Sequence, residues 1–326
     1  MAVETIFQAL ADSTRLRVMR LLGSMELAVG ELAQVLGQSQ PRVSRHVGIL
    51  TSAGLAERRR EGSWVFLRAA HSGEDASGFG AALSRAIELA ETEDEEFART
   101  CLQDRQRLAA IRAAREEQAT SYFAEHAQDW DELRVLHSSD EDVEAALARA
   151  LASAPVGKLL DIGTGTGRMA ELFASSAEHV VALDKSLAML RVARAKLQHL
   201  PTEQVELLQG DFEDLPFADG TFDTVLFHQV LHFAQAPAAA LSEAARVLRT
   251  GGRVAIVDFD AHNREELRAR HAHARLGFED AQMASLLEDA GFAPPVPQAL
   301  DGGELVVKIW IAERLSGART DRKLAS

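Results

Sequence analysis

Hydrophobic positions follow a helical period near the start of the chain and the pattern of buried strands beyond residue 155. Before residue 53 they recur every three or four positions, as in amphipathic helices. Farther on, apolar runs of strand length begin at residues 156, 180, 205, 222 and 253, and helical patterns separate them. Alternation of this kind is typical of a doubly wound α/β sheet. The pattern therefore predicts a helical N-terminal domain followed by an α/β domain.

A glycine-rich turn follows the first of these apolar runs. Gly163, Gly165 and Gly167 stand just before a helical pattern that begins near Met169. Glycine permits a tight turn and the close approach of a ligand, and the start of a helix offers free N–H groups. The spacing departs from the dinucleotide fingerprint, because Arg168 stands where its last glycine would be.

Two acidic residues complete the motif. Asp161 precedes the turn, and Asp184 ends the next apolar run, where a carboxylate can hold ribose hydroxyls. Together with Gly210-Asp211-Phe212 after the third run, the arrangement resembles the class I S-adenosylmethionine (SAM)-dependent methyltransferases. The resemblance implies a Rossmann-like, doubly wound sheet that binds SAM or S-adenosylhomocysteine (SAH). A nucleotide-binding domain of another kind is the alternative.

The resemblance also implies roles for single residues. The glycine loop would hold the methionine moiety and Asp184 the ribose, while Asp211 would accept from the adenine amino group and Phe212 would stack on the ring. Tyr122 and Trp130 are candidates for a lid over SAM, although core packing explains them equally well. The residues expected to bind the cofactor are Tyr122, Trp130, Asp161, Gly163, Thr164, Gly165, Gly167, Asp184, Lys185, Met189, Asp211, Phe212 and His228.

The methyl-acceptor side is less well defined. His228 and His232 follow the fourth strand, at the end where open α/β sheets bind ligands. His232 and His273 are weak candidates for a catalytic base, and nothing in the sequence fixes either. The charged segment 262–275 is expected to form a polar lid helix. Its histidines and Asp258 match no compact metal-binding signature, so no metal site is expected.

The first 70 residues carry a helix-turn-helix pattern. A short helix is predicted over 29–36 and ends at Gly37, as at a typical C-cap. A second helix follows, in which Val43, Val47 and Leu50 form the inner face. Two helices joined by a short glycine-containing turn are typical of DNA-binding proteins, in which the second helix enters the major groove.

A hairpin predicted over residues 55–67, with its turn at 61–63, completes the pattern. The whole resembles the ArsR-type winged-helix transcriptional regulators, and the matching residues are 9–17, 44–47, 53–55 and 59–62. The resemblance implies a homodimer on double-stranded operator DNA. The second helix would read base edges, and the hairpin arginines would contact the backbone. The expected DNA-binding residues are Ser39, Gln40, Arg42, Ser44, Arg45, His46, Arg58, Arg59 and Arg60.

The distribution of charge supports a DNA-binding role for the winged helix. The net charge of −14 argues against general affinity for nucleic acid, but residues 36–70 hold six arginines and only two acidic residues. That local excess is an electrostatic footprint for phosphates. A winged helix used for protein contacts is the alternative. Many members of the family sense metals through cysteines, but the matching segment 25–32 has none, which disfavours a soft-metal sensor.

Residues 71–150 are strongly acidic, with eight arginines and nineteen acidic residues. Phe79, Leu83 and Ile87 recur every four positions, where ArsR-type proteins have a dimerisation helix. A longer helical pattern spans 93–120, but Asp104 interrupts its apolar seam. A helix that lies on a neighbouring domain is therefore favoured over a coiled coil.

The length of 326 residues favours more than one domain. We expect a winged helix at 1–75, a helical dimerisation and connector region at 76–120, a SAM-binding domain at 121–313 and a disordered tail at 314–326. No apolar run approaches the roughly 20 residues that span a bilayer. The absence of a recognisable signal peptide and the single cysteine, Cys101, favour a cytoplasmic protein that does not engage membranes.

Two functions remain open. The favoured one is a DNA-binding transcriptional regulator whose methyltransferase-like domain binds SAM or SAH as its effector. It is favoured because the DNA-reading elements are complete, whereas no catalytic base can be identified. The alternative is an active SAM-dependent methyltransferase of a small-molecule acceptor, fused to a regulatory DNA-binding domain.

Overall fold

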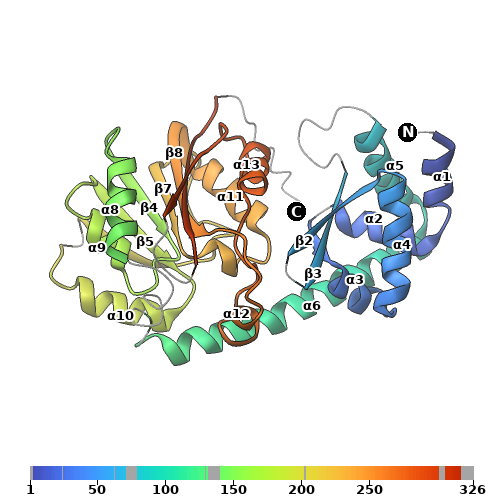
Figure 1. The fold of residues 1–326 in the computed structure, drawn as a ribbon, viewed down its shortest axis with the longest axis horizontal. Coiled ribbons are helices and arrows are strands. Elements are labelled where there is room, and N and C mark those ends of the chain that lie inside the picture. The colour runs from blue at the N-terminus through green and yellow to red at the C-terminus, as the bar shows by residue number, and fades with distance from the viewer. Residues whose placement is uncertain are drawn as a thin grey trace. The chain divides into compact units, whose positions relative to one another are not determined.

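A computed structural model describes residues 3–23, 25–61, 63–70, 79–128, 130, 140–201, 203–300 and 305–316 (Figure 1). The chain divides into two compact units, Met1–Glu117 and Gln118–Ser326. Most of the helical region expected over 76–120 thus shares one unit with the winged helix. The turn residue Gly62 and the turn at 301–303 lie outside the described residues.

The first unit is a winged helix-turn-helix with additional helices. Its elements are α1 (Val3–Leu10), α2 (Ser13–Leu22), β1 (Leu27–Ala28), α3 (Val29–Leu36), α4 (Gln40–Ser52), β2 (Ala56–Glu61), β3 (Trp64–Ala69), α5 (Phe79–Glu93) and α6 (Glu95–His126). The strands form an antiparallel sheet in the order β1-β3-β2. The pairing of β2 with β3 confirms the expected hairpin.

The turn between α3 and α4 forms as the sequence predicts. Gly37 ends α3 with a φ of 64°, in the left-handed region that glycine adopts without strain. The next helix turns Val43, Val47 and Leu50 inward, and all three are buried in the core of the unit. The interior of this small domain is therefore built from the positions that the apolar period selected.

Helices α5 and α6 are part of the same core. Ile87 of α5 and Leu108 of α6 are buried in it, and Leu83 packs against them. Asp104, which interrupts the apolar seam of α6, is also buried and binds Arg17 of α2. Cys101 lies buried nearby, and desolvation raises its pKa to about 11, as expected for an inert structural thiol.

The second unit is a Rossmann-like α/β sandwich. Its elements after α6 are α8 (Asp140–Leu151), β4 (Lys158–Ile162), α9 (Arg168–Phe173), β5 (His179–Asp184), α10 (Leu187–Leu197), β6 (Val205–Gln209), β7 (Phe222–His228), η1 (Leu231–Phe233), α11 (Pro237–Val247), β8 (Leu248–Phe259), α12 (Glu266–Arg270), α13 (Asp280–Asp289), β9 (Val296–Leu300) and β10 (Val307–Glu313). The sheet order is β6-β5-β4-β7-β8-β10-β9. The first five strands in this order are parallel, and β10 runs antiparallel to β8.

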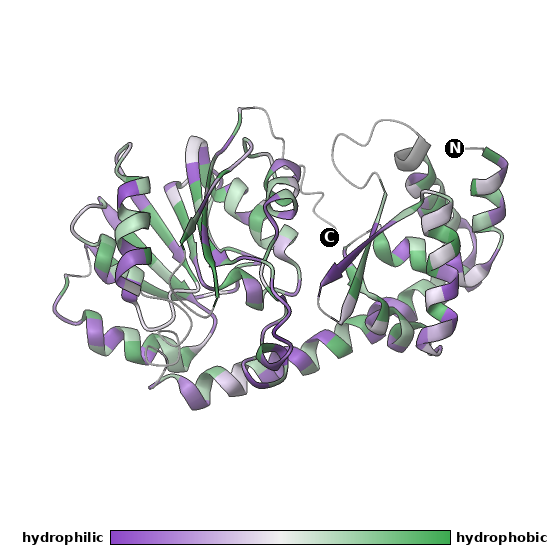
Figure 2. Cartoon of the chain, in the orientation of Figure 1, coloured by the Kyte–Doolittle hydropathy of each residue, from purple (hydrophilic) through white to green (hydrophobic). Residues whose placement is uncertain are grey.

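Successive strand residues point to opposite faces of the sheet. Leu159 packs with α8, α9 and α10, whereas its neighbour Leu160 packs with α11 and α13. Hydrophobic residues are concentrated along these central strands in Figure 2. Because both faces of the sheet are covered, the central parallel strands β4, β5 and β7 are largely apolar and buried, which is the pattern that predicted the fold.

Two features of the sheet depart from expectation. Strand β9 was not predicted, because its sequence is polar and proline-containing, and Val296 is 79% exposed. It pairs only with β10, so a packed face does not dictate its composition. Arg314 and Leu315, which were expected to belong to a disordered tail, form backbone hydrogen bonds with Gly252 and Gly291. Residues 317–326 lie outside the described part of the chain.

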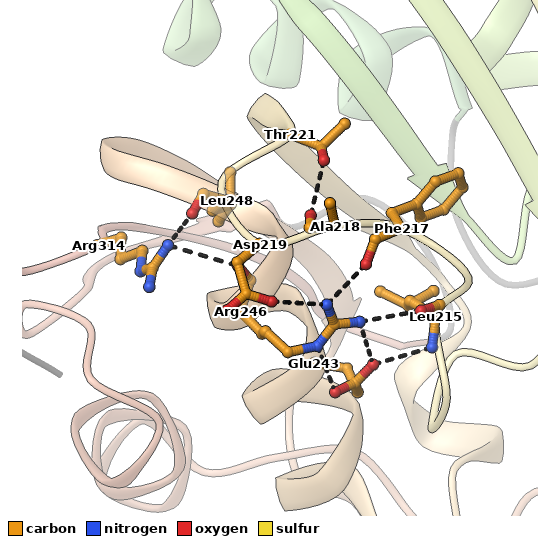
Figure 3. A network of polar contacts seen from close by, with 9 residues as sticks. All are labelled: Leu215, Phe217, Ala218, Asp219, Thr221, Glu243, Arg246, Leu248 and Arg314. Atoms are coloured by element: carbon orange, nitrogen blue, oxygen red, sulfur yellow. Dashed lines mark hydrogen bonds and ion pairs between the residues drawn. The ribbon is translucent and has the colours of Figure 1, made fainter. Parts of the chain in front are cut away.

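Arg246 at the end of α11 secures the loop before β7 (Figure 3). Its guanidinium donates to Glu243, to Asp219 and to the carbonyls of Leu215 and Phe217, at 2.6–2.9 Å. The hydrogen bonds to Glu243 are the main cause of the raised pKa of Arg246. This network fixes an irregular loop at the opposite end of β7 from its carboxyl end.

None of the helices in the described ranges is both long enough and apolar enough to cross a membrane.

Candidate functional site

The glycine turn follows β4, which lies between β5 and β7 in the sheet. Gly163 has a φ of 68°, and a Cβ placed on it would stand 2.3 Å from Cγ2 of Val230. The turn is therefore pressed against the segment that follows β7. Gly167 caps α9 with a φ of 85°, and a Cβ there would stand 2.8 Å from Leu197 of α10. These two glycines serve close packing, whereas the space beside Gly165 faces Trp130.

Asp184 ends β5 and binds the turn directly. Its Oδ2 accepts from the N–H of Gly165 at 2.8 Å, and its Oδ1 accepts from the N–H of Ser186 at 2.7 Å. Desolvation raises the pKa of Asp184, against the lowering effect of the backbone N–H groups around it. A carboxylate held at this position can accept hydrogen bonds from ribose hydroxyls.

Three of the expected cofactor residues already have roles inside the fold. The Thr164 hydroxyl donates to the buried carboxylate of Asp161 at 2.6 Å, and this contact fixes the turn. Met189 is buried at the start of α10, where its N–H donates to Ser186. A contact of any of the three with a ligand stays a prediction.

The segments that follow β5 and β6 supply a charged pair beside Asp184. Lys185 donates from Nζ to Oδ2 of Asp211 at 2.8 Å. Burial alone would raise the pKa of Asp211, but the hydrogen bonds from Lys185 and from the N–H of Glu213 outweigh it and lower the pKa. Asp211 is therefore an ionised acceptor at neutral pH, as adenine binding would require. Phe212 packs against the sheet core, and His228 ends β7 largely buried.

An aromatic cluster lies beside the turn. It comprises Tyr122, Phe123, Trp130, Phe233 and His271, and each is only partly buried. The ring of Phe123 lies 5.3 Å from Trp130 and 4.9 Å from Phe233, and the Tyr122 hydroxyl shares a 2.8 Å hydrogen bond with His271. A Cβ on Gly165 would stand 3.7 Å from Trp130 Nε1. The two lid candidates therefore join one cluster, and Trp130 lies at the turn itself.

Next to this cluster, His232 forms a buried pair with Asp258. His232 lies in η1 and Asp258 near the end of β8, and their side chains are 3% and 1% exposed. Nδ1 of His232 lies 2.8 Å from Oδ1 of Asp258, and the backbone N–H of His232 donates to Oδ2 at 3.1 Å. The ring of His273, the other candidate base, lies 4.2 Å from that of His232. The structure thus brings both candidates together, and His232 is held by the carboxylate of Asp258.

Segment 262–275 is less helical than expected. Its helix α12 covers only Glu266–Arg270. Burial, with further contributions from His126 and Arg270, lowers the pKa of His271. Throughout the described ranges, no group of three or more histidine, cysteine or acidic residues is arranged to hold a metal ion.

The second helix of the helix-turn-helix presents a polar, basic face. The side chains of Ser39, Gln40, Arg42, Ser44 and Arg45 are exposed on α4 and at its start. His46 differs from them, because it is partly buried and its Nδ1 lies 3.6 Å from Asp12. The surface available for base contacts therefore centres on Arg42 and Arg45.

The wing arginines are not equivalent. Arg58 and Arg60 are exposed, whereas Arg59 binds Glu61 at 2.8 Å and Glu26 at 3.3 Å and lies over the ring of Phe66. Despite desolvation, the two carboxylates raise the pKa of Arg59. Arg59 therefore stabilises the wing, and a contact of Arg59 with DNA would compete with these bonds.

Two features escaped the sequence analysis. Asp258 was considered only as a metal ligand, although its position at the carboxyl end of β8 obeys the rule that selected His228 and His232. The second feature is the contact of α6 with the winged helix, where Arg115 binds Glu31 at 2.6 Å and lies over the ring of Trp64. No short sequence motif predicts that contact, because it joins residues about 50 to 85 positions apart.

Comparison with known proteins identifies both domains. Residues 10–59 match the family described as a helix-turn-helix domain, and residues 160–256 match the family described as a methyltransferase domain. The chain thus combines a region similar to helix-turn-helix domains with a region of Rossmann-like fold that is similar to methyltransferase domains.

Proteins similar in sequence match part of this chain. A demethylmenaquinone methyltransferase of Clavibacter sepedonicus is 37% identical over 44% of this chain and 58% of its own length. A phosphatidylethanolamine N-methyltransferase of Cereibacter sphaeroides is 40% identical over 35% of this chain and 56% of its own length. The crystal structure of a SAM-dependent methyltransferase of Aquifex aeolicus is 20% identical, covers 55% of this chain and 90% of that one, and has a TM-score of 0.43. The match therefore covers less than two thirds of the length of the two methyltransferases from Clavibacter sepedonicus and Cereibacter sphaeroides.

Proposed function

We propose that the chain is a DNA-binding transcriptional regulator of the ArsR type, and that its methyltransferase domain binds SAM or SAH as the effector. The observation that carries the proposal is the exposed basic face of α4, where Arg42 and Arg45 stand free of the core in an otherwise acidic protein. A domain that served protein contacts alone would not need this local excess of arginine.

The geometry around the glycine turn supports SAM or SAH as the ligand. Asp184 contacts the turn through Gly165, Asp211 is ionised beside it, and Trp130 lies against it. Asp184 and Asp211 offer carboxylate acceptors for ribose hydroxyls and for an adenine amino group, and this chemistry supports the proposal. The matched domain family is one of methyltransferases, which agrees with a methyl donor or its product as the ligand.

A ligand can regulate DNA binding only if its affinity differs between two states of the protein. Coupling free energies of about 1–3 kcal/mol are ordinary, and they correspond to roughly 5–150-fold in affinity. We propose a homodimer as the DNA-binding form. Leu89 of α5 and Phe7 of α1 are 57% and 59% exposed, and burial against a second copy would stabilise a dimer.

The decisive experiment is fluorescence anisotropy of the protein on its own upstream DNA, titrated with SAM and separately with SAH. We expect one ligand to shift the DNA dissociation constant by about 5-fold or more. DNA binding that neither ligand alters would contradict the effector role. Sedimentation of the free protein would test the homodimer in the same samples.

A second function is favoured by one specific observation, the buried His232–Asp258 pair beside the turn. Such a pair suits an active SAM-dependent methyltransferase that acts on a small-molecule acceptor. The similar proteins named above methylate small molecules according to their names, which supports this candidate. Sustained production of SAH with an acceptor would establish it.

A further inference from the structure

We propose that His232 is the general base of a methyl transfer, that Asp258 is its positioning residue, and that the acceptor is a hydroxyl group on an aromatic ring. This inference rests on the proposed function only in that SAM must bind at the glycine turn. It names the acceptor class and the proton path of the second candidate function.

The place of His232 follows from the packing of the turn. Gly163 touches Val230, and η1 with His232 begins at the next residue after Val230. A second path leads from the turn through Trp130 to Phe233, whose rings are 6.2 Å apart, and then to His232 at 4.0 Å. His232 is therefore linked to the glycine turn by two short chains of contacts, one through Val230 and one through Trp130 and Phe233.

The orientation of the imidazole is set by Asp258. A carboxylate only accepts hydrogen bonds, so the 2.8 Å contact places the ring proton of His232 on Nδ1. Asp258 also accepts from the backbone N–H groups of His232 and Phe259, which fix the carboxylate in turn. In the described part of the chain, no residue forms a hydrogen bond with Nε2. That nitrogen carries the lone pair and is left to take a proton.

The electrostatics favour this role. The carboxylate of Asp258 is 1% exposed, and a buried negative charge stabilises a positive charge that develops beside it. Protonation of Nε2 produces such a charge on His232 during the reaction. Asp258 thus acts as the orienting acid does in a serine protease triad, where it holds the tautomer and stabilises the imidazolium.

The surroundings select the acceptor. Phe233 lies 4.0 Å from the His232 ring, and Phe123 and Trp130 extend the same aromatic surface. These three rings are only partly buried, so they can stack on a flat aromatic molecule. A hydroxyl on such a ring is also acidic enough for a neutral imidazole to deprotonate it. An aliphatic amine would gain little from either feature.

The proposed step couples removal of the hydroxyl proton to transfer of the methyl group. Nε2 of His232 accepts the hydroxyl proton as the acceptor oxygen forms a bond to the methyl carbon of SAM. The bond between that carbon and the sulfonium sulfur breaks, and its electron pair stays on sulfur. The products are the methyl ether of the acceptor and SAH, and His232 then releases its proton to water.

The test measures SAH formation with catechol and with 1,4-dihydroxynaphthalene, alongside SAM affinity by calorimetry. His232→Ala is expected to lower the turnover rate by about 10²–10⁴-fold with unchanged SAM affinity, and added imidazole is expected to restore part of it. The exposed His199 provides the matched control, because His199→Ala should change neither quantity. A full rate in His232→Ala, or a loss that imidazole does not rescue, would overturn the assignment.

Asp258 is tested by a measurement that needs no ligand. In NMR spectra of the free protein, the Nδ1 proton of His232 is expected far downfield and slow to exchange, and Asp258→Asn should remove it. The same variant should lower kcat while the KM for SAM stays constant. An unchanged proton signal, or an unchanged kcat, would refute the positioning role. If the wild type binds SAM but yields no SAH with either acceptor, only this inference falls, whereas absence of SAM binding overturns the proposed function as well.

Discussion

Arg17 and Asp104 form a two-pronged ion pair between α2 and α6, with distances of 2.7 and 2.6 Å from guanidinium nitrogens to carboxylate oxygens. Their side chains are 16% and 2% exposed. The hydrogen bond to Asp104 raises the pKa of Arg17, so its guanidinium stays charged at any moderate pH. The pair explains why a long acidic helix carries a carboxylate in the middle of its apolar seam.

This pairing predicts a large effect of Asp104→Ala on stability. The substitution leaves the Arg17 charge partly buried without a partner, which costs about 3–5 kcal/mol of unfolding free energy. Denaturant unfolding would measure it. The exposed pair of Arg68 and Glu57 is the control, because Glu57→Ala should cost no more than about 1 kcal/mol. Similar losses in the two variants would show that burial does not govern the Arg17 pair.

Arg45→Ala is expected to weaken specific DNA binding without changing SAM affinity. Arg45 is exposed on α4, and loss of a two-pronged contact to a base edge costs about 1–3 kcal/mol. Anisotropy and calorimetry on one preparation measure both affinities. Arg149 is exposed on α8 of the second unit, so Arg149→Ala should leave DNA binding intact. A parallel loss of both affinities in Arg45→Ala would argue against separate binding modules.

The affinity for SAM is expected to fall in mild acid. Asp184 must be ionised to accept two ribose hydroxyls, and desolvation places its pKa above the ordinary value for aspartate. As the pH falls through this raised pKa, the carboxylate takes up a proton and loses acceptor capacity. Calorimetric titrations at a series of pH values would show the decline. Asp184→Asn should bind SAM weakly and should lose this pH dependence, and a decline that persists in the variant would assign it to another group.

Gly165→Val is expected to abolish SAM binding. Gly165 has a φ of 54°, which a β-branched residue adopts only with strain, and its N–H belongs to the contact with Asp184. Gly220 has a similar φ of 68° in the loop before β7, away from the carboxyl ends of the strands. Gly220→Val should therefore bear comparable strain and still bind SAM. Normal calorimetric binding by Gly165→Val would move the ligand away from this turn.

The sequence by itself determined the order of elements and the place of the turns. Gly37 and Gly163 lie at positions with positive φ values, which glycine adopts without strain, so these turns can be predicted from the residue type. Leu159 and Leu160 are both apolar because both sheet faces are covered, and such apolar runs are visible in the sequence of the buried strands. The residues that end parallel strands, such as Asp184, could be found because topology brings all such ends to one side of the sheet.

Only the tertiary structure decided which partners these residues choose. Asp258 and His232 are 26 positions apart, and Arg17 and Asp104 are 87 apart, so no local period relates them. In a run of three arginines, Arg59 is predicted to contact phosphates, but the fold places the carboxylates of Glu26 and Glu61 beside it. The formation of these ion pairs depends on the position that tertiary packing gives to each side chain. A local sequence pattern indicates where the backbone turns and which face of an element is apolar. It does not specify which distant residue will contact a given side chain in the folded protein.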